Sequence, residues 1–445
     1  MNEQLAAFIR EHNIHEVECV IPDMTGMARG KIVPKGLFLA EDSMKMSKAV
    51  LTITVNGEFA EFERFAGAND PDMVCKPDPA TIRLVPWAIE PVAVVIHDCE
   101  DFDGRPVGFS PRAVLRKVLK LYENRGWRPV VAPEMEFYLI RQNTNPHEPL
   151  HPPSGRAGRS EVGRQSFSID AVNDFDPFFQ ELSAFCEAAK LNVETLIHEV
   201  GACQMEINFS HGDAMALADQ VFLFKRAVRE TAYRHNIFAT FMAKPMEGEP
   251  GSAMHIHQSI VDSETGDNIF SNADGSASEL FFHHIGGMQK YLPQAMPMLA
   301  PYVNSYRRLS RHTAAPINVR WGYDNRTCGI RIPPSGPAAR RLENRVPGVD
   351  VNPYLAMAAT LACGYLGMVN KIEPSAPMND SAYDLDYELP RSLEDAVELM
   401  QECPELAEIL GEEFVQAFCA VKEKEFETFN RGITAWEREH LQLHV

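Results

Sequence analysis

The segment VVAPEMEFYLI, residues 130–140, constrains this chain more than any other, because it places two carboxylates inside an apolar run. Nine of its residues are apolar, which predicts a strand buried on at least one face. Glu134 and Glu136 are two residues apart and therefore share one face of that strand, while Met135 and Phe137 share the other. Burying unpaired carboxylates is costly, so something must neutralise this pair.

Three interpretations of the pair are open. The strand could lie at an edge with one wet face, as many alternating strands do. The two groups could form an acid/base pair as in glycosidases, although those carboxylates usually come from separate elements. The pair could instead share a hard metal ion.

Composition narrows the class of protein. The chain has 445 residues, which is enough for a large domain with a smaller one, or for two or three domains. We find no apolar run near the roughly 20 residues of a membrane span, and no signal-peptide pattern at the N-terminus. Nine cysteines without a CxxC pair predict neither a disulfide framework nor a zinc cluster, and favour a reducing cytoplasm. We therefore expect a cytoplasmic protein without a membrane partner.

The net charge of −20 argues against nucleic acid as a partner, because phosphate binding needs a basic surface. The same charge mildly favours cationic ligands or bound metal. An ordinary acidic enzyme explains it equally well.

The first hundred residues are expected to be rich in strands. Residues 15–34 predict a hairpin, with Asp23 and Gly26 in its turn, and residues 91–99 predict a buried strand. A Gly- and Pro-rich linker follows near 100–108. We therefore predict two domains, 1–104 and 105–445.

Helices and strands alternate after this linker. A first helix is expected from the cap Ser110 to Gly126. The polar segment 141–165 predicts a long surface loop. The remaining expected helices lie near 173–190, 213–235, 352–371 and after Ser392, and the expected strands near 129–140, 203–209, 237–244 and 253–261.

Further charged side chains interrupt apolar segments elsewhere. LIHEVGACQMEINF holds Glu199 and Glu206, which one straight strand would send to opposite faces, so a break near Gly201 is needed to bring them together. GSAMHIHQS holds His255 and His257 on one strand face. The remaining charged positions of this kind are Arg331 in GIRIP and Arg341, Glu343 and Arg345 in RRLENRVP.

Taken singly, each feature has a structural explanation. A lone strand histidine is usually a hydrogen-bonded core residue, and alternating Arg and Glu usually form cross-strand ion pairs. Together, five Glu and two His suit Mg²⁺ or Mn²⁺, and the Arg cluster suits phosphate or carboxylate. These groups are those of phosphoryl transfer, although the sequence contains neither GxxxxGK[ST] nor GxGxxG.

These segments resemble the glutamine synthetase family in the same order over nearly the whole chain. The matching blocks are PEMEF, HEVGACQMEI, FMAKP, GSAMHIHQS, NSYRRL, NRTCGIRIP and RRLENRVPGVDVNPYL. Ala253 stands where the family signature usually has glycine. The resemblance implies an α+β fold, with a small N-terminal β-grasp-like domain and a large catalytic domain built on a curved antiparallel sheet.

The resemblance also implies roles for individual residues. It implies two or three Mg²⁺ or Mn²⁺ ions per site, with ATP as co-substrate. One metal near the γ-phosphate would be held by Glu136, Glu199 and Glu206, and another by Glu134, His255 and Glu343. ATP would contact His257, Ser259, Arg331 and Arg341, and glutamate would contact Gly251, Arg308 and Arg345. The catalytic groups would be Arg326, at the transferring phosphoryl group, with Glu136 and Arg345.

Two departures from the family pattern concern the amine. Ammonia-using members carry an acidic residue in a flap where this chain has Ala314, and an Asp-Gly-Ser-Ser segment that is missing here. In this respect the chain looks most like the glutamate–polyamine ligases of that family. Glu61 and Glu63 are candidates for a distal ammonium, although they could equally be solvated turn carboxylates.

The expected activity is ATP-dependent ligation of the glutamate γ-carboxylate to an amine, such as putrescine or spermidine, in polyamine catabolism and nitrogen metabolism. The alternatives are a glutamine synthetase that uses ammonia, an ATP:guanidino phosphotransferase, and a non-catalytic ring protein. The resemblance implies a homo-oligomer, a dodecamer of two hexameric rings. Tyr383 lies where some bacterial members carry a modified tyrosine, and we interpret it as structural.

Overall fold

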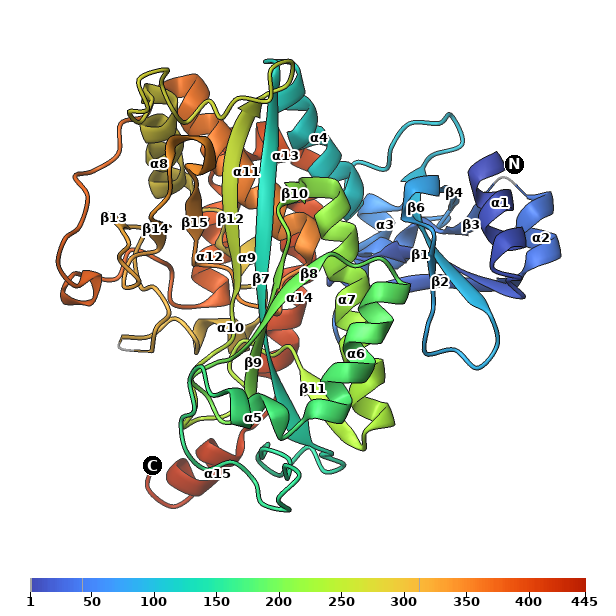
Figure 1. The fold of residues 1–445 in the computed structure, drawn as a ribbon, viewed down its shortest axis with the longest axis horizontal. Helices are drawn as coiled ribbons and strands as arrows, with labels where there is room; N and C mark the ends of the chain where they lie inside the picture. Colours follow the sequence, from blue (N-terminus) through green and yellow to red (C-terminus); the bar gives the residue numbers. More distant parts are fainter. Residues whose placement is uncertain (1, 42, 312) are drawn as a thin grey trace.

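A computed structural model describes residues 2–41, 43–311 and 313–445, which form two sheets with helices around them (Figure 1). The N-terminal sheet has six strands in the order β2–β1–β6–β4–β3, with β5 beside β6. Its elements are α1 (Glu3–Glu11), β1 (Glu16–Pro22), β2 (Ala28–Pro34), α2 (Lys35–Ala40), β3 (Met44–Ser47), α3 (Phe62–Phe65), β4 (Asp72–Pro77), β5 (Arg83–Leu84) and β6 (Val92–Glu100).

The expected N-terminal hairpin is formed by β1 and β2. Asp23 organises its turn, because its Oδ1 accepts hydrogen bonds from the amides of Thr25 and Met27, each at 2.9 Å. Gly26 has a φ of +83°, a conformation that glycine adopts without strain. The prediction of strand, turn and strand is confirmed here, and β6, also predicted, pairs with β1 in parallel.

The second sheet carries the residues of interest. It has nine strands in the order β13–β14–β15–β12–β7–β9–β8, with β10 and β11 also paired to β7. Its pairs are antiparallel except β13 with β14, so the expected α+β class with an antiparallel catalytic sheet is confirmed. The strands are β7 (Trp127–Arg141), β8 (Val193–His198), β9 (Gln204–Phe209), β10 (Gly212–Asp213), β11 (Ile237–Thr240), β12 (Met254–Asp262), β13 (Trp321–Tyr323), β14 (Ile330–Ile332) and β15 (Leu342–Asn344).

Helices cover one face of this sheet and lie behind the strands in Figure 1. α4 and α7 contact β7, and α11 packs on α4, α7 and α8. The helices of this part are α4 (Pro111–Glu123), α5 (Ile169–Asn173), α6 (Asp176–Ala188), α7 (Ala214–Arg234), α8 (Glu279–Tyr291), α9 (Met296–Leu299), α10 (Val303–Tyr306), α11 (Pro353–Asn370), α12 (Leu393–Gln401), α13 (Pro404–Leu410), α14 (Glu412–Asn430) and α15 (Ala435–Leu441).

The central strand β7 has the two faces that its sequence predicts. Met135 and Phe137 are fully buried in the hydrophobic core. Because side chains alternate along a strand, Glu134 and Glu136 point to the opposite face. The first of the three interpretations, an edge strand, is wrong, because β7 lies between β12 and β9.

The predicted break near Gly201 is confirmed, because β8 and β9 form a hairpin with Gly201 in its turn. Glu199 and Glu206 consequently line one cavity. One helix differs from the sequence expectation, because α8 was not predicted. Its Gly287 lies so close to α11 that an added Cβ would be 2.5 Å from the Cα of Gly367. Glycine lowers helix propensity, but at this position it allows the two helices to pack closely.

Other boundaries agree with expectation within a few residues. α4 ends at Glu123 with the cap at Asn124, before the expected Gly126. Residues 142–168, all of which the structure describes, contain no helix or strand, as the long-loop prediction requires. Within the described residues, we find no helix with the length and apolar character that crossing a bilayer requires.

A buried arginine joins the two parts of the chain. Arg112 of α4 is 1% exposed, and its guanidinium pairs with Asp78 and Asp98 of the N-terminal part, each at 2.8 Å. It also pairs with Asp219 of α7 at 3.0 Å. Removing one partner of such a buried network is strongly destabilising, so Arg112 fixes the N-terminal sheet against the helices of the larger part.

Candidate active site

The charged side chains named above form a row across the uncovered face of the sheet. Strand register sets their order. Glu206 of β9 lies opposite Glu136 of β7, and Glu134 lies opposite His255 of β12. On the other side of β12, Glu343 of β15 lies opposite His257. Residues distant in the sequence therefore meet because the sheet order brings their strands together.

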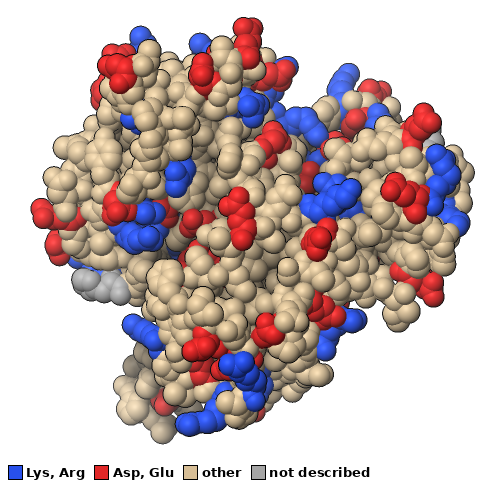
Figure 2. Space-filling model, viewed as in Figure 1, with Lys and Arg blue, Asp and Glu red and all other residues tan. Residues whose placement is uncertain are grey.

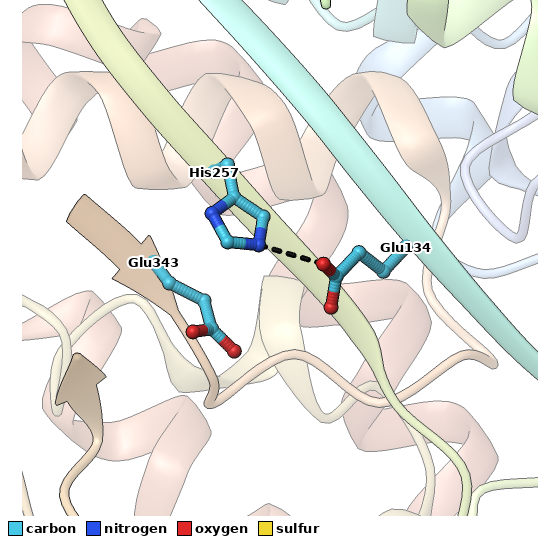
Figure 3. A group of neighbouring side chains, drawn as sticks. All are labelled: Glu134, His257 and Glu343. Atoms are coloured by element: carbon cyan, nitrogen blue, oxygen red, sulfur yellow. Dashed lines mark hydrogen bonds and ion pairs between the residues drawn. The ribbon is translucent and has the colours of Figure 1, made fainter. Parts of the chain in front are cut away.

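Glu134, His257 and Glu343 form a compact group at the centre of this row (Figure 3). Each offers a ligand atom, and these atoms lie within 4.8 Å of one another. His257 Nε2 is 2.8 Å from Glu134 Oε1, and His255 Nδ1 is 3.3 Å from Glu134 Oε2. Burial alone would raise the pKa of Glu134, but hydrogen bonds with His255 and His257 outweigh burial and hold its pKa well below the ordinary value.

A second cluster, made of the carboxylates of Glu136, Glu199 and Glu206, lies beside this one. Burial and the charge of Glu199 raise the pKa of Glu136 to about 8, and burial with the charge of Glu136 raises the pKa of Glu206 to about 9. Burial also raises the pKa of Glu199. Crowded carboxylates of this kind hold protons in the absence of a cation and bind a cation when they lose them.

Arginines line the other side of the site. Glu343 is 1% exposed and pairs with both Arg331, at 2.7 Å, and Arg345. Burial alone would raise the pKa of Glu343, but the charge of Arg345 outweighs burial and lowers the pKa to about 2. Glu343 therefore stays ionised at neutral pH.

Arg308 lies deeper than the sequence suggests. It is 3% exposed, and its two Nη groups donate to the carbonyls of Arg345 and Val346 at 3.0 and 2.8 Å. Gly251 leaves room for it, because a Cβ there would lie 2.6 Å from Arg308 Cγ. In this conformation Arg308 holds the backbone that carries Arg345, and it also lines the cavity described next.

Two cavities open on this face and meet at Glu134 and Asn208. The first has a volume of about 440 Å³ and contains the cluster of Glu136, Glu199 and Glu206. Its lining residues are Glu134, Glu136, Phe167, Ile197, Glu199, Val200, Gln204, Glu206, Asn208, Pro250, Gly251, Ala253, His255, Arg308, Thr313, Ala314, Ala315, Arg326, Arg331 and Arg345. The second, of about 420 Å³, is lined by Val130, Val131, Ala132, Glu134, Glu194, Thr195, Asn208, Phe209, His211, His257, Gln258, Ser259, Ala338, Ala339 and Arg341. Viewed from this side, basic and acidic side chains lie next to one another near β14 and β15 (Figure 2). We name the first the acceptor cavity and the second the nucleotide cavity, after the ligands that the resemblance implies for their residues.

The donor set fits divalent cations. Carboxylate oxygens with one or two imidazoles are the ligands that Mg²⁺ and Mn²⁺ accept. The raised pKa values of Glu136, Glu199 and Glu206 show that these buried charges lack sufficient neutralisation from protein groups alone. A cation between this cluster and the group of Glu134, His257 and Glu343 would supply the missing positive charge.

Most residues singled out from the sequence line these cavities, with three exceptions. Neither Glu61 nor Glu63 is among the described residues that line either cavity, and Glu61 pairs with the nearby Arg64 at 3.0 Å. Glu343 lies behind the cavity wall, paired as described above.

Ala314 faces the acceptor cavity, with its backbone at a φ of +62°. Tyr383 is 7% exposed, and its hydroxyl donates to the carbonyl of Ala315 at 3.1 Å, which agrees with a structural role.

Sequence reasoning missed Gln204, which is a centre of hydrogen bonding in the acceptor cavity. Its Nε2 donates to Glu136 Oε2 at 3.2 Å and to the carbonyl of Gly251 at 3.0 Å. Its Oε1 accepts from the amide of Gly201 at 3.0 Å. The signal was present, since Gln204 and Asn208 are two residues from Glu206 on either side and share its face.

Comparison with known proteins identifies the family. Residues 108–441 match the family model described as glutamine synthetase, catalytic domain. The chain belongs to the glutamine synthetase family. It is 32% identical to a glutamate–isopropylamine ligase of Pseudomonas sp over 97% of this chain and 95% of that protein. It is 33% identical to the gamma-glutamylputrescine synthetase PuuA of Escherichia coli (strain K12), over 97% and 92% of the two chains. It is also 32% identical to the glutamine synthetase of Pyrococcus woesei, over 96% and 97%.

Solved structures agree with this family assignment. The structure titled "Apo GmaS without ligand" superimposes with a TM-score of 0.84 at 28% identity, over 99% of both chains. A "GmaS/ADP complex" has a TM-score of 0.83. As a member of the glutamine synthetase family, the chain is an ATP-dependent ligase that joins glutamate to an amine through a C–N bond.

The raised pKa values predict how cation binding depends on pH. Ligand carboxylates must lose their protons before they bind a cation. Glu136 and Glu206, with pKa values of about 8 and 9, are protonated at neutral pH. We therefore expect the affinity for Mn²⁺ to rise about tenfold per pH unit for each proton displaced, up to these pKa values. Calorimetric titration with Mn²⁺ at about pH 6, 7 and 8, in buffers of different ionisation enthalpy, measures affinity and proton release together. Binding that is independent of pH and releases no proton would contradict this expectation.

Proposed function

We propose that this chain ligates the γ-carboxylate of glutamate to a di- or polyamine, such as putrescine or spermidine, with ATP converted to ADP and phosphate. The observation that carries the choice of amine is Ala314, a side chain without charge that faces the acceptor cavity. An ammonium pocket needs an anion near the nitrogen, and an alanine leaves space instead. The names of two relatives, which specify isopropylamine and putrescine, support an amine larger than ammonia.

The two cavities suit the two steps of such a reaction. A γ-carboxylate oxygen of glutamate attacks the γ-phosphorus of ATP, the bond to the bridging oxygen breaks, and ADP leaves. The resulting γ-glutamyl phosphate is then attacked at its carbonyl carbon by the unprotonated amine. The new C–N bond forms, phosphate leaves, and the nitrogen loses one proton. Phosphorylation is needed because a free carboxylate has no adequate leaving group.

We assign the nucleotide cavity to ATP, with His257, Ser259 and Arg341 along it. Arg341 Nε donates to His257 Nδ1 at 3.3 Å, which orients the imidazole toward Glu134. Arg331 lines the acceptor cavity and pairs with Glu343, and we assign it to the phosphate oxygens of ATP. The divalent cations, when bound by the carboxylate and imidazole groups, would neutralise phosphate charge and polarise the phosphorus.

We assign the acceptor cavity to glutamate and the transferring phosphoryl group. Arg345 and Gly251 would meet the glutamate carboxylates, with Arg308 behind them. Arg326 lines the cavity near Glu199 and would stabilise charge on the moving phosphoryl group. Such preorganised cations act at the position where charge develops, which is why they accelerate the step.

The direct test is an amine panel. Purified protein is incubated with glutamate, ATP and Mn²⁺ and with ammonia, isopropylamine, butylamine, putrescine or spermidine, and ADP release is measured together with the mass of the γ-glutamyl product. Amine-dependent ADP release with a γ-glutamyl-polyamine product supports the proposal. Rapid formation of glutamine alone would instead establish a glutamine synthetase, and no ADP release with any amine would favour a non-catalytic member.

Assembly is part of this proposal, because Glu61 and Glu63 lie outside both cavities of their own chain. Because they do not line the acceptor cavity of their own chain, we expect them to contact an amine in the acceptor cavity of a neighbouring subunit. We propose a closed homo-oligomer, a dodecamer of two hexameric rings, in which the N-terminal domain (1–104) of one subunit borders the catalytic domain (105–445) of the next. Nine free, buried cysteines are compatible with the reducing cytoplasm that we propose as its location.

We expect deletion of residues 1–104 to abolish activity. The truncation removes Asp78 and Asp98, two of the three acidic partners of Arg112, and any contribution to a neighbouring site. The control is the double variant Glu61→Gln/Glu63→Gln in the full chain. It keeps the N-terminal domain and removes only these two charges. Sedimentation and steady-state assays measure assembly and activity. A fully active monomer, truncated or whole, would overturn the proposed assembly.

A further inference from the structure

Phe167 is an exposed aromatic side chain at the acceptor cavity. The side chain is 72% exposed, yet it is one of the residues that line the cavity. Its backbone has a φ of +62°, a conformation that a bulky residue adopts only at a cost. Exposure and strain together at a ligand cavity are a reason to look for a function.

The loop holds Phe167 in place by specific hydrogen bonds. The amide of Phe167 donates to the carbonyl of His198, the last residue of β8, at 2.8 Å. On the same loop, Glu161 Oε2 accepts from the amide of Cys203 at 2.7 Å and lies 3.1 Å from His198 Nε2. The segment 161–168 is therefore fastened to the β8–β9 turn that carries Glu199. The exposure of Phe167 is a consequence of this fixed backbone and not of a loose loop.

The acceptor cavity has apolar as well as charged lining. Ile197, Val200, Pro250 and Ala314 line the same cavity as Phe167, together with the carboxylates and arginines. Apolar side chains contribute little to holding phosphate or the charged ends of glutamate. They suit the carbon atoms of an amine substituent, and an aromatic face also attracts an alkylammonium ion.

We propose that Phe167 is a specificity-determining residue that contacts the carbon chain of the amine next to the reacting nitrogen. This inference rests on the proposed glutamate–amine ligase activity and concerns its acceptor. A primary amine with a carbon chain would be held against Phe167 with its nitrogen directed toward the glutamyl carbonyl. A nucleophile without carbon would make no such apolar contact with Phe167.

The test uses Phe167→Gly, because glycine adopts a φ of +62° without strain and so removes the ring while favouring the native backbone. The readout is the ratio of kcat/KM for butylamine to kcat/KM for hydroxylamine, a small nucleophile without carbon. We expect this ratio to fall about tenfold or more, mainly through a higher KM for butylamine. Phe167→Leu, which keeps an apolar side chain, should recover part of the ratio.

The matched control is Val162→Ala, which removes apolar surface from the same loop at a side chain that is 92% exposed and is not among the described residues lining either cavity. The ratio should be unchanged in this variant. An equal loss for butylamine and hydroxylamine in Phe167→Gly, an unchanged ratio, or loss of the oligomer in sedimentation would each overturn the inference. If the ratio falls but putrescine is no better than butylamine in the wild-type enzyme, the contact with Phe167 is supported and the polyamine choice is the part that fails.

Discussion

Replacing Glu136 by glutamine is expected to lower kcat by on the order of a thousandfold or more, at saturating ATP and glutamate. Both hydrogen bonds that the protein makes to Glu136, from Gln204 and from the amide of Ala253, go to its Oε2. A glutamine oxygen can accept both of them, so the change replaces only the other carboxylate oxygen and removes the charge. Glu199→Ala should have a comparable effect on turnover.

Without metal, the Glu136→Gln variant should be more stable than the wild-type protein, and this difference in stability should grow as the pH rises. The pKa of Glu136 is raised from 4.5 to about 8 in the folded protein, so the folded state binds the proton more tightly than the unfolded state. The wild-type protein therefore loses stability as the pH rises from about 4.5 to about 8, whereas glutamine cannot ionise. Thermal unfolding near the two ends of this window, with and without Mn²⁺, measures the effect. Mn²⁺ should raise the Tm of Glu136→Gln less than that of wild type.

The control is Glu264→Gln, a change of the same chemistry at an exposed residue beyond the end of β12. It should leave turnover and the response to Mn²⁺ unchanged. Full activity of Glu136→Gln at limiting Mn²⁺ would show that the metal assignment is wrong.

The periodicity of strands explains which parts of the site the sequence could predict. A period of two places Glu134 with Glu136 and His255 with His257, and the structure confirms both pairs on one face of the sheet. Periodicity says nothing about which strands are neighbours. The sequence therefore could not show that His257 lies opposite Glu343 across β12 and β15, or that Arg331 pairs with the same carboxylate.

The remaining differences also have physical causes. The family resemblance groups His255 with Glu134 and Glu343 as metal ligands, whereas in the structure His257 is the imidazole in the compact group and His255 lies 3.3 and 3.6 Å from the two carboxylates. In the absence of a cation, either imidazole can take the carboxylate as a hydrogen-bond partner. Phe167 could not be predicted, because its position depends on a loop that distant backbone groups hold in place. The ligand set stays a prediction that the Glu136 and Mn²⁺ experiments test.

The second large effect concerns the amine, where we expect putrescine or spermidine to exceed ammonia about 100-fold or more in kcat/KM. An alkylammonium has a pKa of about 10, so the amine is protonated at neutral pH and must lose a proton before it attacks. Ala314 cannot assist, because it has no ionisable group. In a diamine, the second ammonium can anchor in this acidic protein and position the reacting end, and its charge lowers the pKa of that end.

Substitution of Ala314 separates volume from charge at this position. Ala314→Glu and Ala314→Gln both fill the acceptor cavity and should lower kcat/KM for putrescine about tenfold or more. Only Ala314→Glu adds an anion near the nitrogen, so only this variant should show a gain for ammonia, and that gain should be small because one carboxylate does not rebuild a pocket. Ala314→Gly, which adds no volume and relaxes a backbone with a φ of +62°, is the control and should retain the preference for putrescine. If ammonia matches the best amine in the wild-type enzyme at equal concentration and pH, the polyamine proposal fails, and the protein is a glutamine synthetase that deprotonates ammonium without an acidic side chain at this position.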